Sequence, residues 1–277
     1  MISTLVKSIY RKPGVLLPIL LLLLVFLSAI FAGLLSGQDP LEQNIGERLE
    51  PPSKGHIFGT DGFGRDVFCR VLYGSRVSLS IGLLSLIVAS AAGVAVGLVS
   101  AYVGGKLDLV LQRVIDIMLG FPFLVLAIMI VIIFDPSPSS VAVSIALALM
   151  PKIARLSRSA ALLIIQEEYI LAARMSGAKT GPVIIRHVLP NSLPAILAQI
   201  TGYLGLAVGA EATLSFLGLG VPPPYPSWGG LLLEGTRQYL EAAPWVTLFP
   251  GIVLGVTVMS FAILGDALQH LIDVRKR

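Results

Sequence analysis

Six long apolar runs, separated by polar stretches, dominate the pattern of the chain. They cover residues 15–35, 78–102, 112–134, 140–165, 195–220 and 245–264. The first run would extend roughly 32 Å as a helix at about 1.5 Å per residue, enough to cross the hydrocarbon core of a bilayer. The pattern therefore predicts an all-α membrane protein with six transmembrane helices.

A signal peptide is the alternative for the first run. Signal peptides carry an apolar region of about 7–15 residues followed by an A-x-A-like cleavage site. Run 15–35 is longer and no convincing site of this kind follows it. We interpret it as an uncleaved first membrane helix.

Small residues and one proline predict how the runs pack. Within lipid, glycines let neighbouring helices approach closely. They recur inside the second and fifth runs, at Gly82, Gly93, Gly97, Gly202, Gly205 and Gly209. These two runs are therefore expected to be interior packing helices, and Phe121-Pro122 should kink the third run.

The composition agrees with a polytopic membrane protein. Mean hydropathy is +0.88, and 13% of residues are charged, against about 25% in soluble domains. The net charge of +4 arises from basic residues that flank apolar runs, which favours membrane topology over nucleic-acid binding. The single cysteine, Cys69, and three scattered histidines give no expectation of a disulfide framework or a metal site.

The distribution of Lys and Arg predicts the orientation. If the N-terminus is cytoplasmic, fourteen of the 20 basic residues lie on the cytoplasmic side and six on the other side, which favours both termini inside. Six of the fourteen stand at the chain ends, at Lys7, Arg11, Lys12, Arg275, Lys276 and Arg277. The polar loop 166–194 then faces the cytoplasm.

A polar segment, residues 36–76, follows the first run. Its prolines and glycines predict a loop with little regular structure until Asp66. An amphipathic surface helix is expected to follow and to lead into the second span. Around Gly64, the charges of Asp61, Arg65 and Asp66 are expected to form an ion-pair network that fixes the loop; direct contact with a substrate or receptor is the alternative.

The polar loop 166–194 reads as two short helices. Glu167 and Glu168 suit the start of the first, and Gly177 suits its end. The second begins near Pro182 and ends or kinks at Pro190. Ala173, four residues before Gly177, would give a face with little side chain that a partner can approach closely.

Basic and acidic residues flank the third and fourth spans. Lys152, Arg155 and Arg158 share one helix face, where anchoring at the interface by long side chains is the favoured interpretation. Asp108, Arg113 and Asp116 could pair with one another around the short inner loop. Between the last two spans, Trp228, Tyr239 and Trp245 suit either the membrane interface or a docking surface.

Several motifs carry a family resemblance. Residues 172–190 resemble the EAA loop of permease subunits of binding-protein-dependent ABC importers. The matching pattern is Ala172-Ala173, three residues, Gly177, nine residues and His187-Val188-Leu189-Pro190. Five further motifs are similar to those of the C-type permease of dipeptide, oligopeptide and nickel importers. They are GTDGFGRD, EATLSFLGLG, PSWGG, FPG and GDAL. The likeness extends over about residues 39–273. One departure is Leu171, where the pattern usually has an acidic residue, and Glu168 is a candidate to replace that carboxylate.

The resemblance implies a type I ABC importer permease fold, in which loop 166–194 is a cytoplasmic coupling helix seated in a groove of an ATPase subunit. The residues implied in ATPase coupling are Glu168, Tyr169, Ala172, Ala173, Gly177, His187, Leu189 and Pro190. It implies a division into residues 1–76, the first helix with an extracytoplasmic loop, and residues 77–277, the transmembrane domain. Glu211, Ser215 and Phe216 in the fifth span are expected at the translocation path or at the permease interface. The residues assigned to the extracytoplasmic loops are Asp61, Gly64, Arg65, Asp66 and Trp228.

The chain is expected to be a non-catalytic subunit without a bound cofactor. Gly177-Ala178-Lys179-Thr180 lacks the glycines of a phosphate-binding loop, so ATP and Mg²⁺ would be used by partner subunits. The implied partners are a second homologous permease, two cytoplasmic ATPase subunits and an extracytoplasmic solute-binding protein, in the cell (inner) membrane. Peptides are the preferred substrate, with nickel or another small solute as the alternative. A secondary transporter or channel is the alternative of another class.

Overall fold

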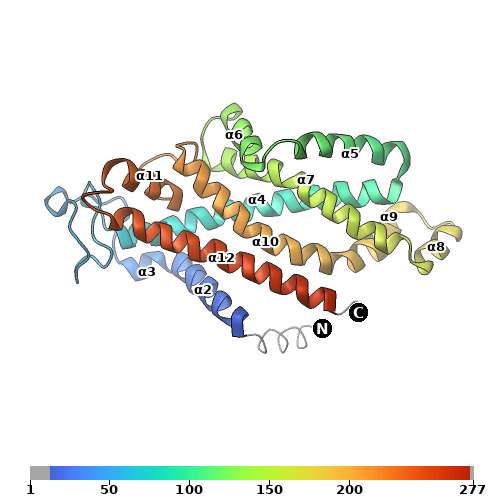
Figure 1. Cartoon of the computed structure of the whole chain (residues 1–277), viewed down its shortest axis with the longest axis horizontal. Helices are drawn as coiled ribbons and strands as arrows, with labels where there is room; N and C mark the ends of the chain where they lie inside the picture. Colours follow the sequence, from blue (N-terminus) through green and yellow to red (C-terminus); the bar gives the residue numbers. More distant parts are fainter. Residues whose placement is uncertain (1–12, 275–277) are drawn as a thin grey trace.

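The computed structural model describes residues 13–274. Within this range the chain consists of helices and loops, with an isolated β-bridge between Thr60 and Asp66. The helices form an elongated bundle (Figure 1). Their bounds are α2 Pro13–Ile30, α3 Ala32–Ser36, η1 Ile45–Glu47, α4 Val67–Val103, α5 Gly105–Leu119, α6 Phe123–Ile133, α7 Pro138–Ile165, α8 Glu168–Met175, α9 Thr180–Val183, η2 Ile184–Val188, α10 Leu189–Phe216, α11 Trp228–Gln238 and α12 Trp245–Val274.

Four helical stretches are long and apolar enough to cross a membrane: α4, α7, the continuous stretch from α9 to α10, and α12. The first apolar run forms a shorter apolar helix, α2, followed by α3. The third run was predicted to contain a kink, and it is bent by 93° between α5 and α6. Pro122 stands at this break, directly before α6. Its missing N–H costs no hydrogen bond there, because an N–H at the start of a helix has no acceptor within the helix.

Helix α4 packs on α7 and α10. A Cβ on Gly82 would lie 2.7 Å from the Val208 side chain of α10, and one on Gly97 would lie 2.4 Å from the Ala154 carbonyl of α7. Both distances are shorter than a carbon atom tolerates, so the glycines permit these crossings. The predicted close approach at glycines is confirmed at these crossings. The prediction that the second and fifth runs are the interior helices is not, because α7 is the most buried span, with 61% of its most apolar stretch buried against 44% for α4 and 33% for the stretch from α9 to α10.

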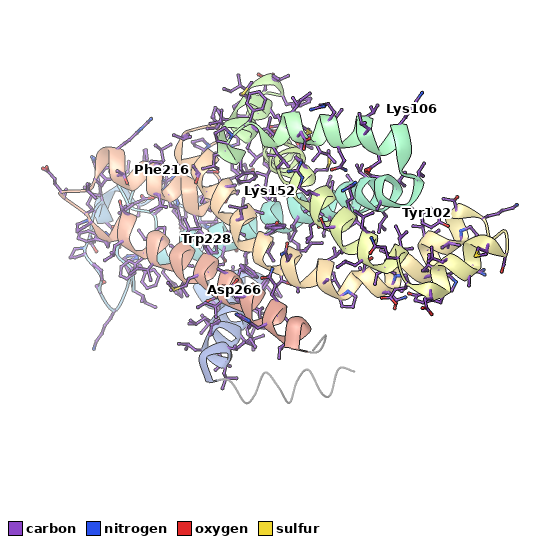
Figure 2. The ribbon with its side chains drawn as sticks, turned by 45° about the vertical axis from the view of Figure 1, so that its right-hand side comes forward. Tyr102, Lys106, Lys152, Phe216, Trp228 and Asp266 are labelled. Carbon is purple, nitrogen blue, oxygen red and sulfur yellow. The ribbon has the colours of Figure 1, made fainter. Side chains whose placement is uncertain are left out.

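Loops gather at the two opposite ends of the bundle (Figure 1). We call the end with residues 37–66 and α11 the α11 end, and the end with α8 and α9 the α8 end. Phe216 and Trp228 lie toward the first, Tyr102 and Lys106 toward the second (Figure 2). The terminal basic residues used to predict orientation, Lys7, Arg11, Lys12, Arg275, Lys276 and Arg277, lie outside the described residues.

The loop ends at Asp66 as predicted, but the helix that follows is not a separate surface helix. Loop 37–66 passes directly into α4, one helix of 37 residues. Asp66 caps its first turn, because its Oδ1 accepts a hydrogen bond of 2.7 Å from the Cys69 N–H. The division predicted between residues 76 and 77 falls inside α4 and stays a prediction.

Candidate functional site

Helix α8 packs on one side only. Its Ile170 is fully buried in a cluster with Leu98, Ala161 and Val188 of the neighbouring helices. On the other side, Leu171 is 47% and Met175 is 89% exposed. Leu171 and Met175 lie four residues apart and therefore share one helix face. The sequence prediction did not include this apolar patch, although the spacing of Leu171 and Met175 along the helix indicates it.

The predicted small-residue face lies beside this patch. Gly177 ends α8 as predicted, with φ +76°, a conformation that suits glycine. Nothing lies within 4 Å of a Cβ built on it. Ala172 and Gly177 are exposed, whereas Ala173 is half-buried. A partner can therefore reach Ala172, Leu171 and Met175 more readily than Ala173. Glu168 is exposed in the first turn of α8.

A polar contact ties α8 to the helix that follows it. The Asn191 side chain of α10 donates hydrogen bonds to the Tyr169 hydroxyl at 3.1 Å and to the His187 carbonyl at 2.7 Å. The Tyr169 and His187 rings meet edge to face with centroids 6.2 Å apart. Tyr169 is therefore tied to His187 and Asn191, and these contacts hold α8 against the start of α10.

Pro190 does not end the second helix, which corrects the prediction. The chain runs through a π-helical turn, η2, into α10, and Leu189 and Pro190 form the first turn of α10. Pro190 lacks the N–H that an α-helix would use at this point. The wide turn before it keeps the helix continuous from Thr180 to Phe216.

The basic residues of α7 form pairs with α5. Arg158 donates to Asp108 through Nε–Oδ1 at 2.8 Å and Nη2–Oδ2 at 2.6 Å, and Arg155 pairs with Asp116. Lys152 Nζ lies 5.0 Å from the centre of the Phe123 ring. The sequence did not predict these pairs, and interfacial anchoring of the three residues stays a prediction. Arg113 forms no ion pair within residues 13–274.

At the α11 end, four charged side chains form what we call the arginine cluster: Asp61, Arg65, Arg70 and Glu234. Asp61 Oδ2 accepts from Arg65 Nε at 2.7 Å and from Arg70. Glu234 of α11 lies 2.5 Å from Arg65 Nη2 and 3.1 Å from Arg70 Nη1. The predicted pair of Asp61 and Arg65 is confirmed, whereas Arg70 and Glu234 were missed as its partners.

Asp66 belongs to a different contact. Its Oδ2 lies 2.8 Å from His56 Nδ1, while Glu47 lies 3.4 Å from His56 Nε2. Burial acts to lower the pKa of His56, but the hydrogen bond to Asp66 and the charges of Asp66 and Glu47 outweigh it, so the pKa is raised above its ordinary value. Asp66 thus caps α4 and holds His56, and it does not join Arg65.

The tryptophans fix the α11 end from inside. Trp228 is fully buried, and its indole N–H donates to the Val71 carbonyl at 3.2 Å. Trp245 Nε1 donates to the Thr60 carbonyl at 3.0 Å, and Tyr239 is buried. The interpretation of Trp228 as an interfacial or docking residue is therefore wrong, because α11 folds its indole back onto α4.

Glu211 is also interior to this chain. It is fully buried in α10, and its Oε1 accepts a hydrogen bond of 2.8 Å from Ser215 Oγ. Ser78 and Ser227 also face the carboxyl group. Glu211 therefore reaches neither a partner subunit nor an open path in this structure, against both expectations, whereas Phe216 is 38% exposed.

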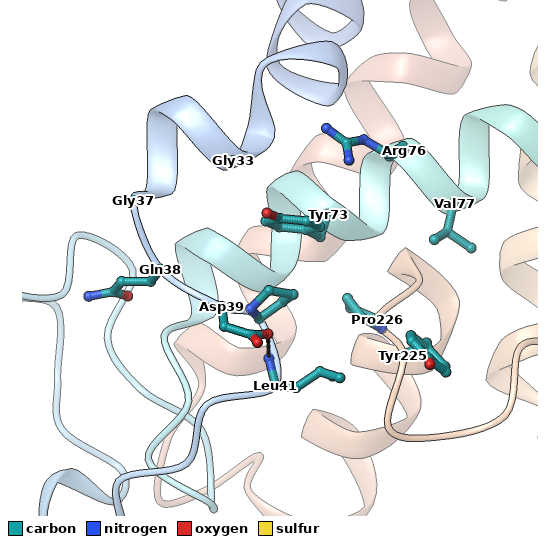
Figure 3. A pocket seen from close by; sticks show the side chains of 11 residues that line it. Gly33, Gly37, Gln38, Asp39, Leu41, Tyr73, Arg76, Val77, Tyr225 and Pro226 are labelled. Carbon is teal, nitrogen blue, oxygen red and sulfur yellow. Dashed lines mark hydrogen bonds between the residues drawn. The ribbon is translucent and has the colours of Figure 1, made fainter.

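The first helices are held at the same end. Arg76 of α4 donates to the carbonyls of Ala29 and Ile30 at 2.9 and 3.0 Å, which satisfies the end of α2. A cavity of about 570 Å³ lies below it, between the segment around Asp39 and the Tyr225 loop (Figure 3). Apart from Asp39 and Arg76, its lining carries no charged side chain.

These features define an α-helical, multi-pass membrane protein with an exposed apolar patch on a short helix at one end and a network of buried charges at the other. The model of the family described as binding-protein-dependent transport system inner membrane component matches residues 93–277. The chain belongs to this family, and it is a transport permease component.

Individual relatives agree with this assignment. The dipeptide transport system permease protein DppC of Alkalihalophilus pseudofirmus is 40% identical, over 98% of this chain and 89% of the relative. The oligopeptide transport system permease protein OppC of Bacillus subtilis is 34% identical, over 94% of this chain and 85% of the relative. The assignment decides against the secondary transporter or channel.

Solved structures show the fold. A structure of the MetNI methionine ABC transporter in an inward facing conformation matches with a TM-score of 0.61 at 20% identity, over 73% of this chain and 95% of that chain. An amino acid ABC transporter matches with a TM-score of 0.55 at 16% identity, over 73% and 93%. The fold is that of a type I ABC importer permease.

Proposed function

We propose that this chain is the C-type permease of an importer for dipeptides or oligopeptides, and that it forms the translocation path with a second, homologous permease. Two cytoplasmic ATPase subunits supply the energy from ATP and Mg²⁺. An extracytoplasmic binding protein delivers the peptide at the α11 end. Both termini then lie in the cytoplasm, together with the α8 end.

The apolar patch of α8 carries this proposal. Ile170 anchors the helix in the bundle while Leu171 and Met175 face outward. An exposed apolar patch on a loop is typical of a surface that a protein partner covers. The contact of Tyr169 with Asn191 would pass a displacement of α8 directly to α10.

The peptide substrate is supported by the relatives. Its relatives include permeases named for dipeptide, oligopeptide and glutathione transport. The described residues contain no group of three or more His, Cys, Asp or Glu side chains placed to hold a metal ion. Peptide import is therefore proposed ahead of nickel import.

Substitution of the patch tests the ATPase contact. Met175→Asp places a charge where an apolar contact is expected and should reduce co-purification of the ATPase subunits about tenfold or more, since burial of an unpaired charge is costly. Leu240→Asp makes the same kind of change in an exposed residue at the α11 end and should leave association unchanged. Normal association of a double variant, Leu171→Asp with Met175→Asp, would rule out docking on this patch.

A further inference from the structure

A second cavity lies at the α11 end, beside the arginine cluster. It has a volume of about 530 Å³ and is lined by α11, the last turn of α10, the proline-rich loop 218–226 and part of loop 37–66. We call it the α11 cavity. Its size is in the usual range for small-molecule sites, about 300–1,000 Å³.

The charged residues that line the α11 cavity are Arg65, Arg70, Glu234 and Arg237. Asp61 stands behind them, bonded to Arg65 and Arg70. Three guanidinium groups thus face two carboxylates, which leaves one positive charge in excess. The cavity is therefore built to accept one further negative charge.

The excess charge belongs to Arg237. Arg65 and Arg70 are almost fully buried, at 5% and 3% exposure, and each is held by Asp61 and Glu234. Arg237 is exposed, and no carboxylate pairs with it within residues 13–274. Its guanidinium is therefore the group that is free to bind a ligand.

A second observation is that one buried donor of the arginine cluster lacks a hydrogen-bond acceptor. Arg70 Nε is buried and has no hydrogen-bond partner among the described residues. A buried donor without a partner costs about 1–3 kcal/mol. Arg70 is one of the residues that line the cavity, so the electrostatic attraction of a bound anion would stabilise this buried cation, whose hydrogen bonding is incomplete.

We propose that the α11 cavity binds the C-terminal carboxylate of a peptide as it enters the permease, with Arg237 as the pairing group. A carboxylate matches the two parallel N–H donors of a guanidinium. Ser215 also lines the cavity, and it lies in the last turn of α10. This inference depends on the proposed function and adds to it which end of the substrate the permease holds.

The test compares two peptides in the reconstituted complex with its binding protein. Tri-alanine carries the carboxylate and tri-alanine amide does not, so a loss confined to tri-alanine reports on the carboxylate. Arg237→Gln should lower tri-alanine uptake about tenfold, the effect of losing one charge-assisted hydrogen bond. It should leave uptake of the amide within about twofold of wild type. Arg237→Lys keeps the charge but not the two parallel donors, so it should restore only part of the tri-alanine uptake.

Lys54→Gln removes the same charge from an exposed position in loop 37–66 that does not line the cavity, and it should change neither uptake. Equal losses for both peptides in Arg237→Gln would overturn the carboxylate site and would favour docking of an acidic surface of the binding protein on Arg237. Wild-type complex that imports neither peptide would instead contradict the peptide substrate itself.

Discussion

Arg158 of α7 holds Asp108 of α5 through two hydrogen bonds, Nε–Oδ1 at 2.8 Å and Nη2–Oδ2 at 2.6 Å. The Asp108 carboxylate also accepts from Ser100 of α4. Gln112 donates to the same Ser100 hydroxyl at 2.9 Å. One carboxylate therefore joins α4, α5 and α7 on the α8 side of the break between α5 and α6.

Removing this carboxylate should destabilise the protein. Asp108→Asn leaves the Arg158 charge without its partner in a half-buried site, and we expect a loss of about 1–2 kcal/mol, reduced by partial solvent screening. The matched control is Asp116→Asn, whose pair with Arg155 is 49% exposed on both sides and should contribute less than about 0.5 kcal/mol. Thermal unfolding of the purified variants in detergent measures both. Equal losses would contradict the special position of Asp108.

A glycine in loop 37–66 should tolerate no side chain. Gly64 has φ +71°, and a Cβ on it would lie 1.7 Å from the Asn44 carbonyl oxygen. Gly64→Ala should therefore cost about 3 kcal/mol or more, because the backbone itself must move. Gly37 has φ +63° with open space around it, so Gly37→Ala carries only the conformational penalty of about 1 kcal/mol. Proteolysis of the α11 end is the readout, and similar cleavage rates in both variants would count against a steric cause.

The contact of His56 with Asp66 should make the α11 end sensitive to pH. The pKa of His56 is raised in the folded protein, so protonated His56 stabilises the fold below its unfolded pKa of about 6.5. This contribution is lost as the pH rises through the folded pKa. We expect the unfolding midpoint to fall between about pH 6 and about pH 8. His56→Gln should remove that part of the decrease, and an unchanged pH profile in this variant would refute the assignment.

The contact between Tyr169 and Asn191 should matter for coupling more than for assembly. Tyr169→Phe keeps the ring against His187 but removes the hydroxyl that accepts from Asn191 at 3.1 Å. We expect the number of ATP molecules hydrolysed per peptide imported to rise about two- to tenfold, the effect of one hydrogen bond. ATPase subunits should still co-purify. Tyr73→Phe, at a half-buried tyrosine of α4 that does not line the α11 cavity, serves as control, and identical ratios in the two variants would exclude this role.

Several features of the site follow from local sequence. Gly177 and Asp66 mark helix ends because they meet needs of the backbone next to them, a positive φ and a capping acceptor. The break at Pro122 is local for the same reason, since proline lacks the N–H of a helix interior. The side-chain face at Leu171 and Met175 also follows from helical spacing, since the two residues lie four apart.

Other features depend on which helices become neighbours. Arg65 and Glu234 are 169 residues apart, and neither sequence position indicates the other. The sequence predicted Trp228 at the membrane interface and Glu211 at the pathway. Both are buried instead, because α11 and α10 pack on α4, and local sequence does not indicate this packing. Arg155 and Arg158 found acidic partners only because α5 folds back along α7.

By itself, the sequence determined the apolar helices, the turn residues between them and the family, because hydrophobic periodicity, glycine and proline act within a few residues of the chain. The tertiary structure alone decided which charges are paired, which aromatic residues are buried and where the α11 cavity lies. Those properties depend on the distances between side chains from separate helices, and such distances are set by packing.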